Sequence, residues 1–257
     1  MSLDTPLQRG FEFLLSEPDA PLSAWVQSIW SASVLQTEPV VKPLYPDAGS
    51  GIIFNLRGEV RIGTEVLPEG IIMLPVKHKA AHIALASGAE LMGVRFHPAI
   101  GFGVLGRLYD KPTLLPQEDS QYSLHETYTA LQTTTGSSCR IEVLYQWAHC
   151  HLALILAVPD SLEKALEYVE QGDLSGGLSG YSNQSLRQIE RQFRTWLGIT
   201  PKHYQRVLRI KKTVSYLRQN PDAKLADVAF QFGFSDQAHM TREFRAIVDI
   251  TPRQVQR

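Results

Sequence analysis

Cysteine and long apolar stretches are scarce in this sequence. Only two of the 257 residues are cysteines, Cys139 and Cys150, which excludes a disulfide framework, and their spacing matches no metal or redox motif. The longest apolar run, Leu152 to Val158, is too short to cross a bilayer, and the segment from Met1 to Gly10 lacks a signal-peptide core. We therefore expect a soluble, cytoplasmic protein without a membrane partner.

The sequence motifs of the common enzymes are also missing. There is no P-loop, no dinucleotide fingerprint and no G-x-S-x-G nucleophile elbow. His78, His82 and His97 lack the paired H-x-H spacing with a following glutamate, and the adjacent residues His149 to His151 would point to different faces of a helix. We expect no catalytic residue, no metal and no cofactor, and hence no enzyme.

The net charge of −1 conceals an uneven distribution of charge along the chain. Residues 1–173 carry 11 Lys+Arg against 20 Asp+Glu, whereas residues 174–257 carry 14 against 6, which gives balances of −9 and +8. A basic segment gains affinity for a phosphate backbone by releasing counterions. The asymmetry favours two domains with different partners, and the alternative is that solubility or chance produced it.

Short apolar segments separated by turns dominate the first ~130 residues. Gly63 and the Pro68-Glu69-Gly70 turn interrupt them, and Pro98 follows the last one. Their spacing predicts a small barrel or sandwich. The expected strands are Gly51–Leu56, Val60–Ile62, Glu65–Leu67, Gly70–Leu74, Ala81–Ala86 and Glu90–Phe96.

Helical periodicity replaces this pattern in the second half of the chain. From Ser138 onward, apolar residues recur every three or four positions until Pro159, which predicts a helix that packs within its own subunit or on a partner chain. Asp160 begins another helix, with Glu163 completing a capping box and Gly172 as its stop.

We therefore predict an α+β protein of two domains. Residues 1–158 form a β-rich domain with C-terminal helices, and residues 159–257 form an all-α domain.

The strongest signal is a self-match at an offset of 51 residues. Phe193–Arg206 (FRTWLGITPKHYQR) and Phe244–Arg257 (FRAIVDITPRQVQR) share seven of fourteen positions, and Lys202 against Arg253 keeps its charge. A repeat of this kind predicts one structural unit used twice.

The second unit is predicted to be helix, glycine turn, helix. A short amphipathic helix from Leu225 ends near Phe232, Gly233 provides the turn, and Ser235 is the expected cap of the next helix. Such a unit places its second helix in the major groove of DNA. That helix is expected to bury Met240, Phe244, Ile247 and Val248. Its opposite face carries Ala238, Thr241, Arg242 and Arg245.

The first unit has a matching second helix, capped by Ser185 and ended by Gly198. Its expected buried residues are Leu186, Ile189, Phe193, Trp196 and Leu197. Arg187, Gln188 and Arg191 point the other way. Arginine can donate two bonds to guanine and glutamine can pair with adenine, so these side chains suit base reading.

A long basic helix is expected to join the two units. Thr200 and Pro201 supply its cap and first turn, and it runs to about Leu217. The two units, which we call heads, must lie about 34 Å apart, one helical turn, to contact one side of a DNA duplex.

The segment Gly233–Arg245, followed by Thr251–Arg253, resembles the signature of the AraC family of transcription regulators, and Arg187–Lys202 is similar to the family's first unit. The resemblance covers about 100 residues. It implies double-stranded DNA and RNA polymerase as partners. It also implies base and backbone contacts by Arg187, Gln188, Arg191, Gln237, Ala238, His239, Thr241 and Arg242, and we add Arg245 from the same face.

The sequence departs from the family pattern at two places. The expected first helix of the first unit, Leu174 to Tyr181, contains three glycines, each of which costs about 1 kcal/mol relative to alanine, and the turn-like Gly180–Ser182 comes three residues early. Asp249 stands where the first repeat has Gly198. The first unit is therefore less well defined than the second.

The N-terminal half resembles the N-terminal domain of one AraC subgroup through Leu44–Leu56 and Gly93–Pro98, with Trp25 and Trp30 near its start. This resemblance implies a cupin-like barrel that binds a small effector or forms dimers. A small barrel can enclose one ligand, and a buried arginine would favour an anion. Candidate lining residues are Phe54, Arg57, Arg95 and His97; the alternative is that they are packing and surface residues.

Three hypotheses follow. The first is an effector-controlled, DNA-binding transcription regulator, such as an activator. The second is a ligand-independent regulator whose N-terminal domain only forms a homodimer. The third is a cupin-type enzyme or ligand carrier with a degenerate helix-turn-helix tail, which the glycine-rich first unit would favour.

Overall fold

The apolar segments of the N-terminal half form two antiparallel sheets in the computed structural model, which describes residues 10–118, 121–152, 157–171 and 185–256. The six-stranded sheet contains, in spatial order, β1 (Phe11–Ser16), β2 (Val26–Val34), β9 (Glu90–Phe96), β4 (Gly51–Arg57), β7 (Gly70–Leu74) and β10 (Thr113–Leu114). The four-stranded sheet contains β3 (Val40–Leu44), β8 (Ala81–Leu85), β5 (Val60–Ile62) and β6 (Glu65–Leu67).

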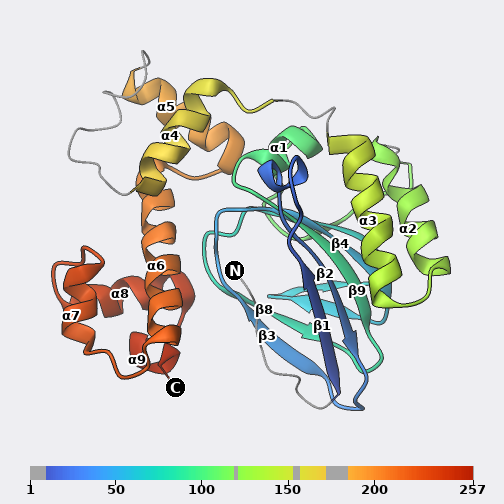
Figure 1. Cartoon of the computed structure of the whole chain (residues 1–257), viewed down its shortest axis with the longest axis horizontal. Coiled ribbons are helices and arrows are strands. Elements are labelled where there is room, and N and C mark those ends of the chain that lie inside the picture. The colour runs from blue at the N-terminus through green and yellow to red at the C-terminus, as the bar shows by residue number, and fades with distance from the viewer. Residues whose placement is uncertain (1–9, 119–120, 153–156, 172–184, 257) are drawn as a thin grey trace. The chain divides into compact units, whose positions relative to one another are not determined.

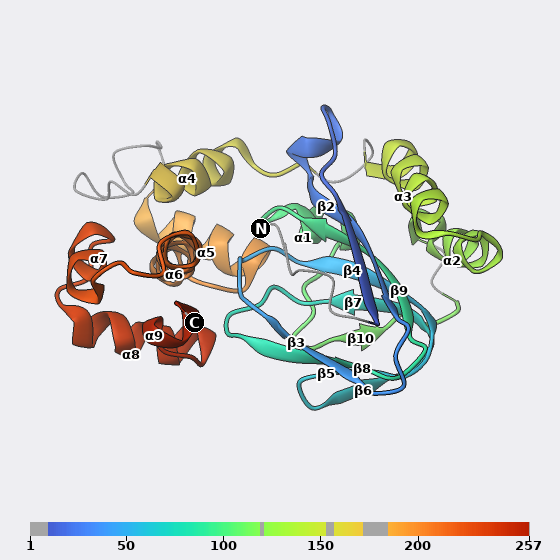
Figure 2. The same cartoon turned by 60° about the horizontal axis from the view of Figure 1, so that its bottom comes forward.

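The two sheets are separate layers, as Figure 2 shows. Among the described residues, no strand pairing joins one sheet to the other, so the closed barrel implied by the family resemblance is replaced by a sandwich-like pair of open sheets. Whether a sheet closes into a barrel depends on which distant strands pair. The alternation of apolar and polar residues along a single strand does not reveal that pairing.

Local patterning located most of the strands. The bounds of β5, β6, β7 and β9 agree with those expected, β4 extends one residue further to Arg57, and β8 ends one residue earlier at Leu85. Strand β4 is buried on both faces because one face lies in the core between the sheets and α2 (Leu124–Thr133) packs on β4 and β7.

The core between the layers combines residues of both sheets. Ile53, Ile72 and Leu91 of the six-stranded sheet pack in one cluster with Val60 and Leu85 of the four-stranded sheet. Each fully buried side chain of this size stabilises the fold by about 1.5–3 kcal/mol.

One close approach within the six-stranded sheet requires glycine. The indole of Trp30 lies against Gly93, where a Cβ atom would overlap the ring. Both residues belong to the segments that carry the N-terminal resemblance, so part of that pattern has a packing origin.

Helices α2 and α3 (Ser137–His151) lie side by side against the six-stranded sheet (Figure 1). Helix α3 buries Ile141, Leu144, Trp147 and Ala148, and Ser31 Oγ of β2 donates to Ser137 Oγ at 3.2 Å. Of the two alternatives, packing within its own subunit is the one that the described residues show. Residues 153–156, which were expected to continue it, lie outside the described residues.

Helix α2 was not predicted from the sequence. It contains three threonines, Thr127, Thr129 and Thr133, and β-branched residues are weak helix formers. The remaining short elements of this half are η1 (Leu22–Ala24), α1 (Ile100–Leu105) and η2 (Gln121–Ser123).

The chain divides into two compact units. The N-terminal unit comprises Met1–Leu44, Gly49–Val76 and Ala81–Ala157, and the C-terminal unit comprises Tyr45–Ala48, Lys77–Ala80 and Val158–Arg257. None of the helices in the described ranges has both the length and the apolar character needed to cross a bilayer.

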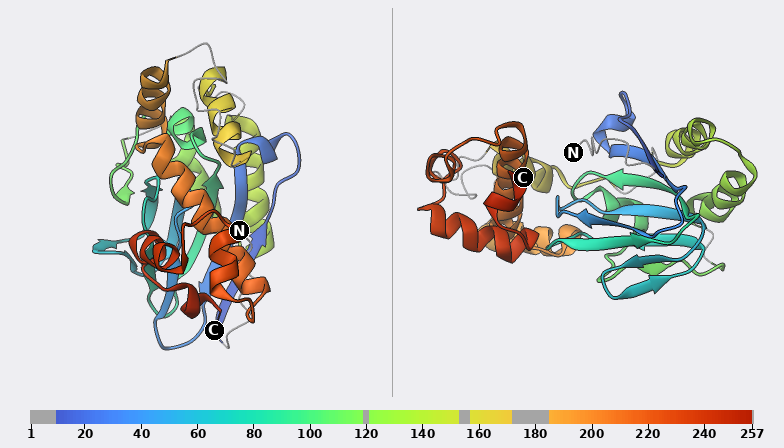
Figure 3. Two further views of the ribbon diagram at one scale, coloured as in Figure 1. Left: turned by 90° about the vertical axis from the view of Figure 1, so that its left-hand side faces the viewer. Right: turned by 90° about the horizontal axis from the view of Figure 1, so that it is seen from below.

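Helix α6 is the long central element of the C-terminal helices (Figures 1 and 3). Helices α4 and α5 pack on one end of α6, and α8 and α9 pack on the other, with α7 against α8. The bounds are α4 (Asp160–Gln171), α5 (Leu186–Leu197), α6 (Pro201–Gln219), α7 (Leu225–Gln231), α8 (Gln237–Val248) and α9 (Pro252–Val255).

The start of α4 differs from the expected capping box. Asp160 is itself the first helical residue, and the amides of Leu162 and Glu163 donate to the carbonyl oxygen of Pro159. Asp160 and Glu163 lie in the first turn, where their charges favour the positive end of the helix dipole.

Candidate nucleic-acid interface

The internal repeat extends further in the structure than in the sequence. Helices α5 and α8 are 12 residues each, and both their first and their last residues are 51 positions apart. The N-caps Ser185 and Asp236 keep this offset, as do the C-caps Gly198 and Asp249. The prediction of one unit used twice is confirmed for this helix and for the helix starts at Pro201 and Pro252.

A capping box closes the N-terminus of α5. Ser185 Oγ accepts a hydrogen bond from the Gln188 amide at 3.4 Å, and Gln188 Oε1 accepts from the Ser185 amide at 2.8 Å and from its hydroxyl at 3.0 Å. At the other end, Gly198 adopts the left-handed conformation with φ 70°. The predicted cap and stop of this helix are both confirmed.

The buried face of α5 consists of Ile189, Phe193, Trp196 and Leu197, as expected. Leu186 is the exception, because it is 49% exposed. It is the first helical residue, one turn before the point where the other apolar side chains meet α4 and α6.

The turn between α7 and α8 follows the predicted glycine geometry. Gly233 has φ 73°, and the Phe234 amide donates to the carbonyl oxygen of Ala229 at 2.9 Å. The cap of α8 is one residue later than predicted: Asp236 Oδ1 accepts from the His239 amide at 2.6 Å. The Ser235 amide instead donates to Nδ1 of His239 at 3.2 Å.

Two outward helix faces remain once the buried residues are assigned. The α5 face consists of Arg187, Glu190, Arg191 and Arg194. The α8 face consists of the equivalent residues Ala238, Thr241, Arg242 and Arg245. All five arginines are exposed, so none of them supports the core.

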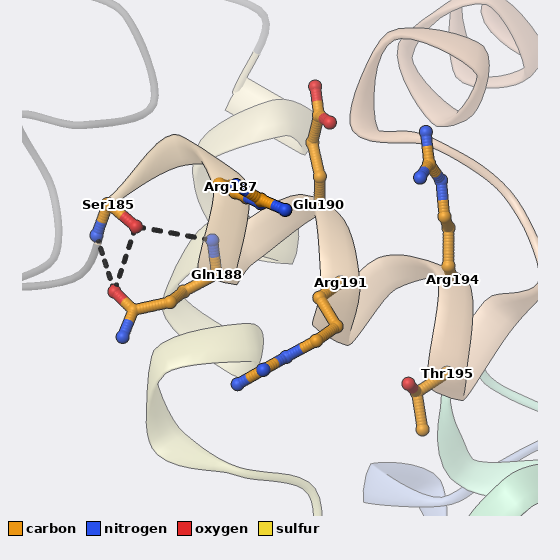
Figure 4. A pocket seen from close by; sticks show the side chains of 7 residues that line it. All are labelled: Ser185, Arg187, Gln188, Glu190, Arg191, Arg194 and Thr195. Carbon is orange, nitrogen blue, oxygen red and sulfur yellow. Dashed lines mark hydrogen bonds between the residues drawn. The ribbon is translucent and has the colours of Figure 1, made fainter.

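Figure 4 shows the α5 face lining a pocket together with Ser185, Gln188 and Thr195. The side chain of Arg191 extends away from that of Glu190, and Arg194 lies one turn further along the helix. A surface with several guanidinium groups held on one helix can accept phosphate oxygens or the acceptor edge of a guanine.

One member of this surface was missed by sequence reasoning. Arg194 is exposed on the α5 face and occupies the position equivalent to Arg245, which was chosen. The repeat already aligned the two residues, so the offset of 51 was sufficient to find Arg194.

The other sequence candidates lie at the helix starts. Gln188 and His239 are equivalent residues that contact their own helix caps, and Gln237 is an exposed first helical residue. The expected first helix of the first unit, Leu174 to Tyr181, lies outside the described residues, as do Gly172 and the Gly180–Ser182 turn.

Several basic residues of α6 hold helices together. Arg206 donates from Nε to Oε2 of Glu243 at 2.7 Å and from Nη2 to Oε1 at 3.0 Å. Burial alone would raise the pKa of Glu243, but the hydrogen bonds and the charge of Arg206 outweigh it, so the pKa of this carboxyl is lowered.

Arg209 and Lys212 also contact protein groups. Arg209 Nη1 donates to the carbonyl oxygen of Gly233 at 3.0 Å, and its guanidinium carbon lies 5.3 Å from the centre of the Phe234 ring. Lys212 Nζ donates to the carbonyl oxygen of Glu170 at 2.7 Å. These contacts position the turn before α8 and the end of α4.

Tyr204 joins α6 to α4 from within the core. Its hydroxyl donates to Oε1 of Glu170 at 2.6 Å, and the residue is fully buried. Burial, followed by the charge of Glu170 and this hydrogen bond, raises the pKa of Tyr204 far above its ordinary value. The tyrosine therefore remains protonated and donates at every physiological pH.

The N-terminal candidates are not brought to one place. Phe54 is fully buried opposite Met92 of β9, and Arg95, three residues further along β9, has its side chain on the other face of the sheet. Arg57 lies at the opposite end of this strand pair, where Nη1 contacts Glu90 Oε1 at 3.2 Å. His97 follows the end of β9.

Histidines, cysteines and acidic residues do not cluster in the part of the chain that the structure describes. No three of them lie close enough there to hold a metal ion.

Residues 178–257 match a helix-turn-helix domain family. The HTH-type transcriptional activator RhaS of Escherichia coli is 37% identical to this chain over 71 residues, which is 28% of this chain and 25% of RhaS. RhaS of Klebsiella pneumoniae gives the same values. The C-terminal part of this chain is therefore similar to helix-turn-helix domains and to a segment of these HTH-type activators. The match spans a quarter of the length of these relatives.

Residues 16–110 match a family described only as a domain of unknown function. Among solved structures, ToxT from Vibrio cholerae is similar to 96% of this chain, with 98% of its own chain covered, 10% sequence identity and a TM-score of 0.48.

Proposed function

We propose that this chain is a sequence-specific transcription regulator that binds double-stranded DNA through α5 and α8, which we call its recognition helices. The observation that carries this proposal is the repeated helix, which turns its apolar side into the core and an exposed, arginine-bearing face outward in both copies. In a helix-turn-helix protein, the second helix of each unit enters the major groove.

Helix α6 provides a rigid spacer between the recognition helices. Its 19 residues correspond to about 28 Å at 1.5 Å per residue. This length is close to the separation of about 34 Å between successive major grooves on one side of a duplex. We infer that the chain contacts two half-segments about one helical turn apart.

Five arginines on the two faces supply the electrostatic part of the affinity. The logarithm of the observed affinity falls linearly with the logarithm of the salt concentration, with a slope of about −0.9 for each phosphate contacted. Arg191 and Arg242 are equivalent in the repeat and suit this role in both heads.

The proposal is tested with the purified full-length chain and a pool of duplexes with a random core. Repeated selection is expected to enrich a two-part motif, and Arg191→Ala and Arg242→Ala are each expected to weaken binding to it. Arg61→Ala, which removes an exposed arginine from the four-stranded sheet, is the control. No enrichment, or wild-type affinity of both variants at the same salt, overturns the proposal.

We further propose that residues 159–257 bind DNA and that the N-terminal domain, residues 1–158, senses a small effector or forms a homodimer. RhaS is named as a transcriptional activator, and RNA polymerase is the partner that such an activator requires.

Ultracentrifugation of the full chain, alone and with the selected duplex, distinguishes a monomer from a dimer. Thermal-shift screening against small carboxylates tests the effector.

A further inference from the structure

The two recognition helices are built alike but carry different outward residues at two equivalent positions. Arg187 on α5 corresponds to Ala238 on α8, and Glu190 corresponds to Thr241. The remaining two positions of each face are arginine in both. Building on the proposed function, we propose that the two heads read unlike half-segments of DNA and that these two pairs set the difference.

The third helical residue of each recognition helix is excluded from this task by its own cap. Both lone pairs of Gln188 Oε1 are engaged by the amide and the hydroxyl of Ser185, at 2.8 and 3.0 Å. The two-point contact of a glutamine with adenine needs this oxygen as an acceptor. Gln188 is thus a positioning residue, contrary to its expected role as a reader of adenine.

His239 is the equivalent residue on α8 and is engaged in the same way. Its Nδ1 accepts from the Ser235 amide at 3.2 Å, and Ser235 Oγ lies 3.1 Å from the same nitrogen. Only Nε2 is left as a single donor, which suits a phosphate better than the edge of a base pair. Base reading therefore falls to the residues of the two faces.

On the α5 face, the distinguishing pair has strong and opposite charges. Arg187 can donate two bonds to O6 and N7 of a guanine, and Glu190 can accept from N4 of a cytosine. No hydrogen bond or ion pair engages Glu190 within the described residues, and Figure 4 shows its carboxylate directed away from Arg191.

An unpaired carboxylate is unfavourable next to phosphates. It is tolerated on a DNA-binding face where it meets a donor, and the cytosine amino group is the major-groove donor that acidic side chains accept from. Arg187 and Glu190 are three positions apart and thus neighbours on one helix face. The α5 half-segment is expected to contain G·C pairs at these contacts.

On the α8 face, the same two positions carry no charge. Ala238 and the methyl group of Thr241 can contact the methyl group of a thymine, and the Thr241 hydroxyl already donates to the Gln237 carbonyl oxygen at 2.9 Å. The α8 half-segment is expected to favour thymine at these positions. Arg191 with Arg194, and Arg242 with Arg245, supply contacts common to both heads.

The test exchanges the distinguishing pair in each direction in the full-length chain. One variant, Arg187→Ala with Glu190→Thr, gives α5 the residues of α8, and the other, Ala238→Arg with Thr241→Glu, does the reverse. All four positions lie on the outward faces, so the buried faces and the caps stay intact. Each variant is selected against the random duplex pool, and binding to the wild-type motif is measured by fluorescence anisotropy.

The wild type is expected to select two unlike halves. The first variant should lose its G·C preference only in the α5 half, with discrimination falling roughly tenfold per base pair, and the second should gain a G·C preference only in the α8 half. Gln188→Ala should lower the stability of α5 without changing the selected bases.

Two results would count against unlike reading: a wild-type motif with identical halves, or unchanged motifs in both exchange variants that still bind DNA. A wild-type chain that enriches no duplex overturns the proposed function and this assignment together. A shift of base preference at one position in Gln188→Ala would return the role of base reader to Gln188.

Discussion

Arg206 and Glu243, 37 positions apart, form a two-point ion pair that fastens α8 to α6. The side chain of Glu243 is only 16% exposed, and that of Arg206 is 34% exposed. Because the pair lies on the inner side of α8, it helps to hold the opposite, arginine-bearing face in a constant orientation. Its loss should therefore affect the second head more than the first.

Arg206→Ala is expected to lower the free energy of unfolding by about 1–3 kcal/mol, because a mostly buried carboxylate loses its partner. Chemical denaturation measures the effect, and hydrogen exchange of the α8 amides localises it. The double variant Arg206→Ala with Glu243→Gln should be less destabilised than the sum of the two single variants. Strict additivity would show that the pair contributes nothing.

The stability of this contact should depend on acid pH. The pKa of Glu243 is lowered in the folded chain from its ordinary value of 4.5, so its contribution is fully present above that value. It is lost as the pH falls through the lowered pKa. The difference in unfolding free energy between wild type and Glu243→Gln should be constant near neutrality and shrink in acid. A difference independent of pH would exclude this ion pair as its cause.

Gly198 and Asp249 end the two recognition helices in the same left-handed conformation, with φ 70° and 56°. A residue with a Cβ atom is unfavourable there by roughly 1 kcal/mol. We expect Gly198→Ala to lower the melting temperature and Asp249→Gly to raise it. Circular dichroism measures both. Equal, destabilising effects of the two changes would contradict a shared backbone requirement.

Basic residues of α6 and α8 should differ in what they contribute. Arg209→Ala removes a hydrogen bond to Gly233 and a contact with Phe234, so it should lower stability and leave the salt dependence of DNA binding nearly unchanged. Arg242→Ala should leave stability nearly unchanged and reduce the salt slope of DNA binding by about one. Anisotropy titrations between 50 and 200 mM salt, roughly the range in which such slopes are measured, separate the two.

Features encoded over a few residues were predictable from the sequence. The bounds of four strands, the cap of α5 and the buried face of α8 depend on alternation, helical periodicity and turn chemistry, which neighbouring residues determine together. The repeat was visible because equivalent helices keep the same residues at the same offset. The shift of the α8 cap from Ser235 to Asp236 is small, since either side chain can accept from the first amides.

Only the tertiary structure decided which distant residues meet. In the folded chain, the side chains of Phe54 and Arg95 lie on opposite faces of the sheet, and the strands form two open sheets in place of the expected barrel. Arg206 and Arg209 form hydrogen bonds to other protein groups, whereas Arg191 and Arg242 remain exposed. These outcomes depend on contacts between segments far apart in the chain, and the chemistry of a single arginine is the same in either place. The physical reason is that secondary-structure propensity depends on residues adjacent in the sequence, whereas the packing of distant segments determines which side chains contact one another.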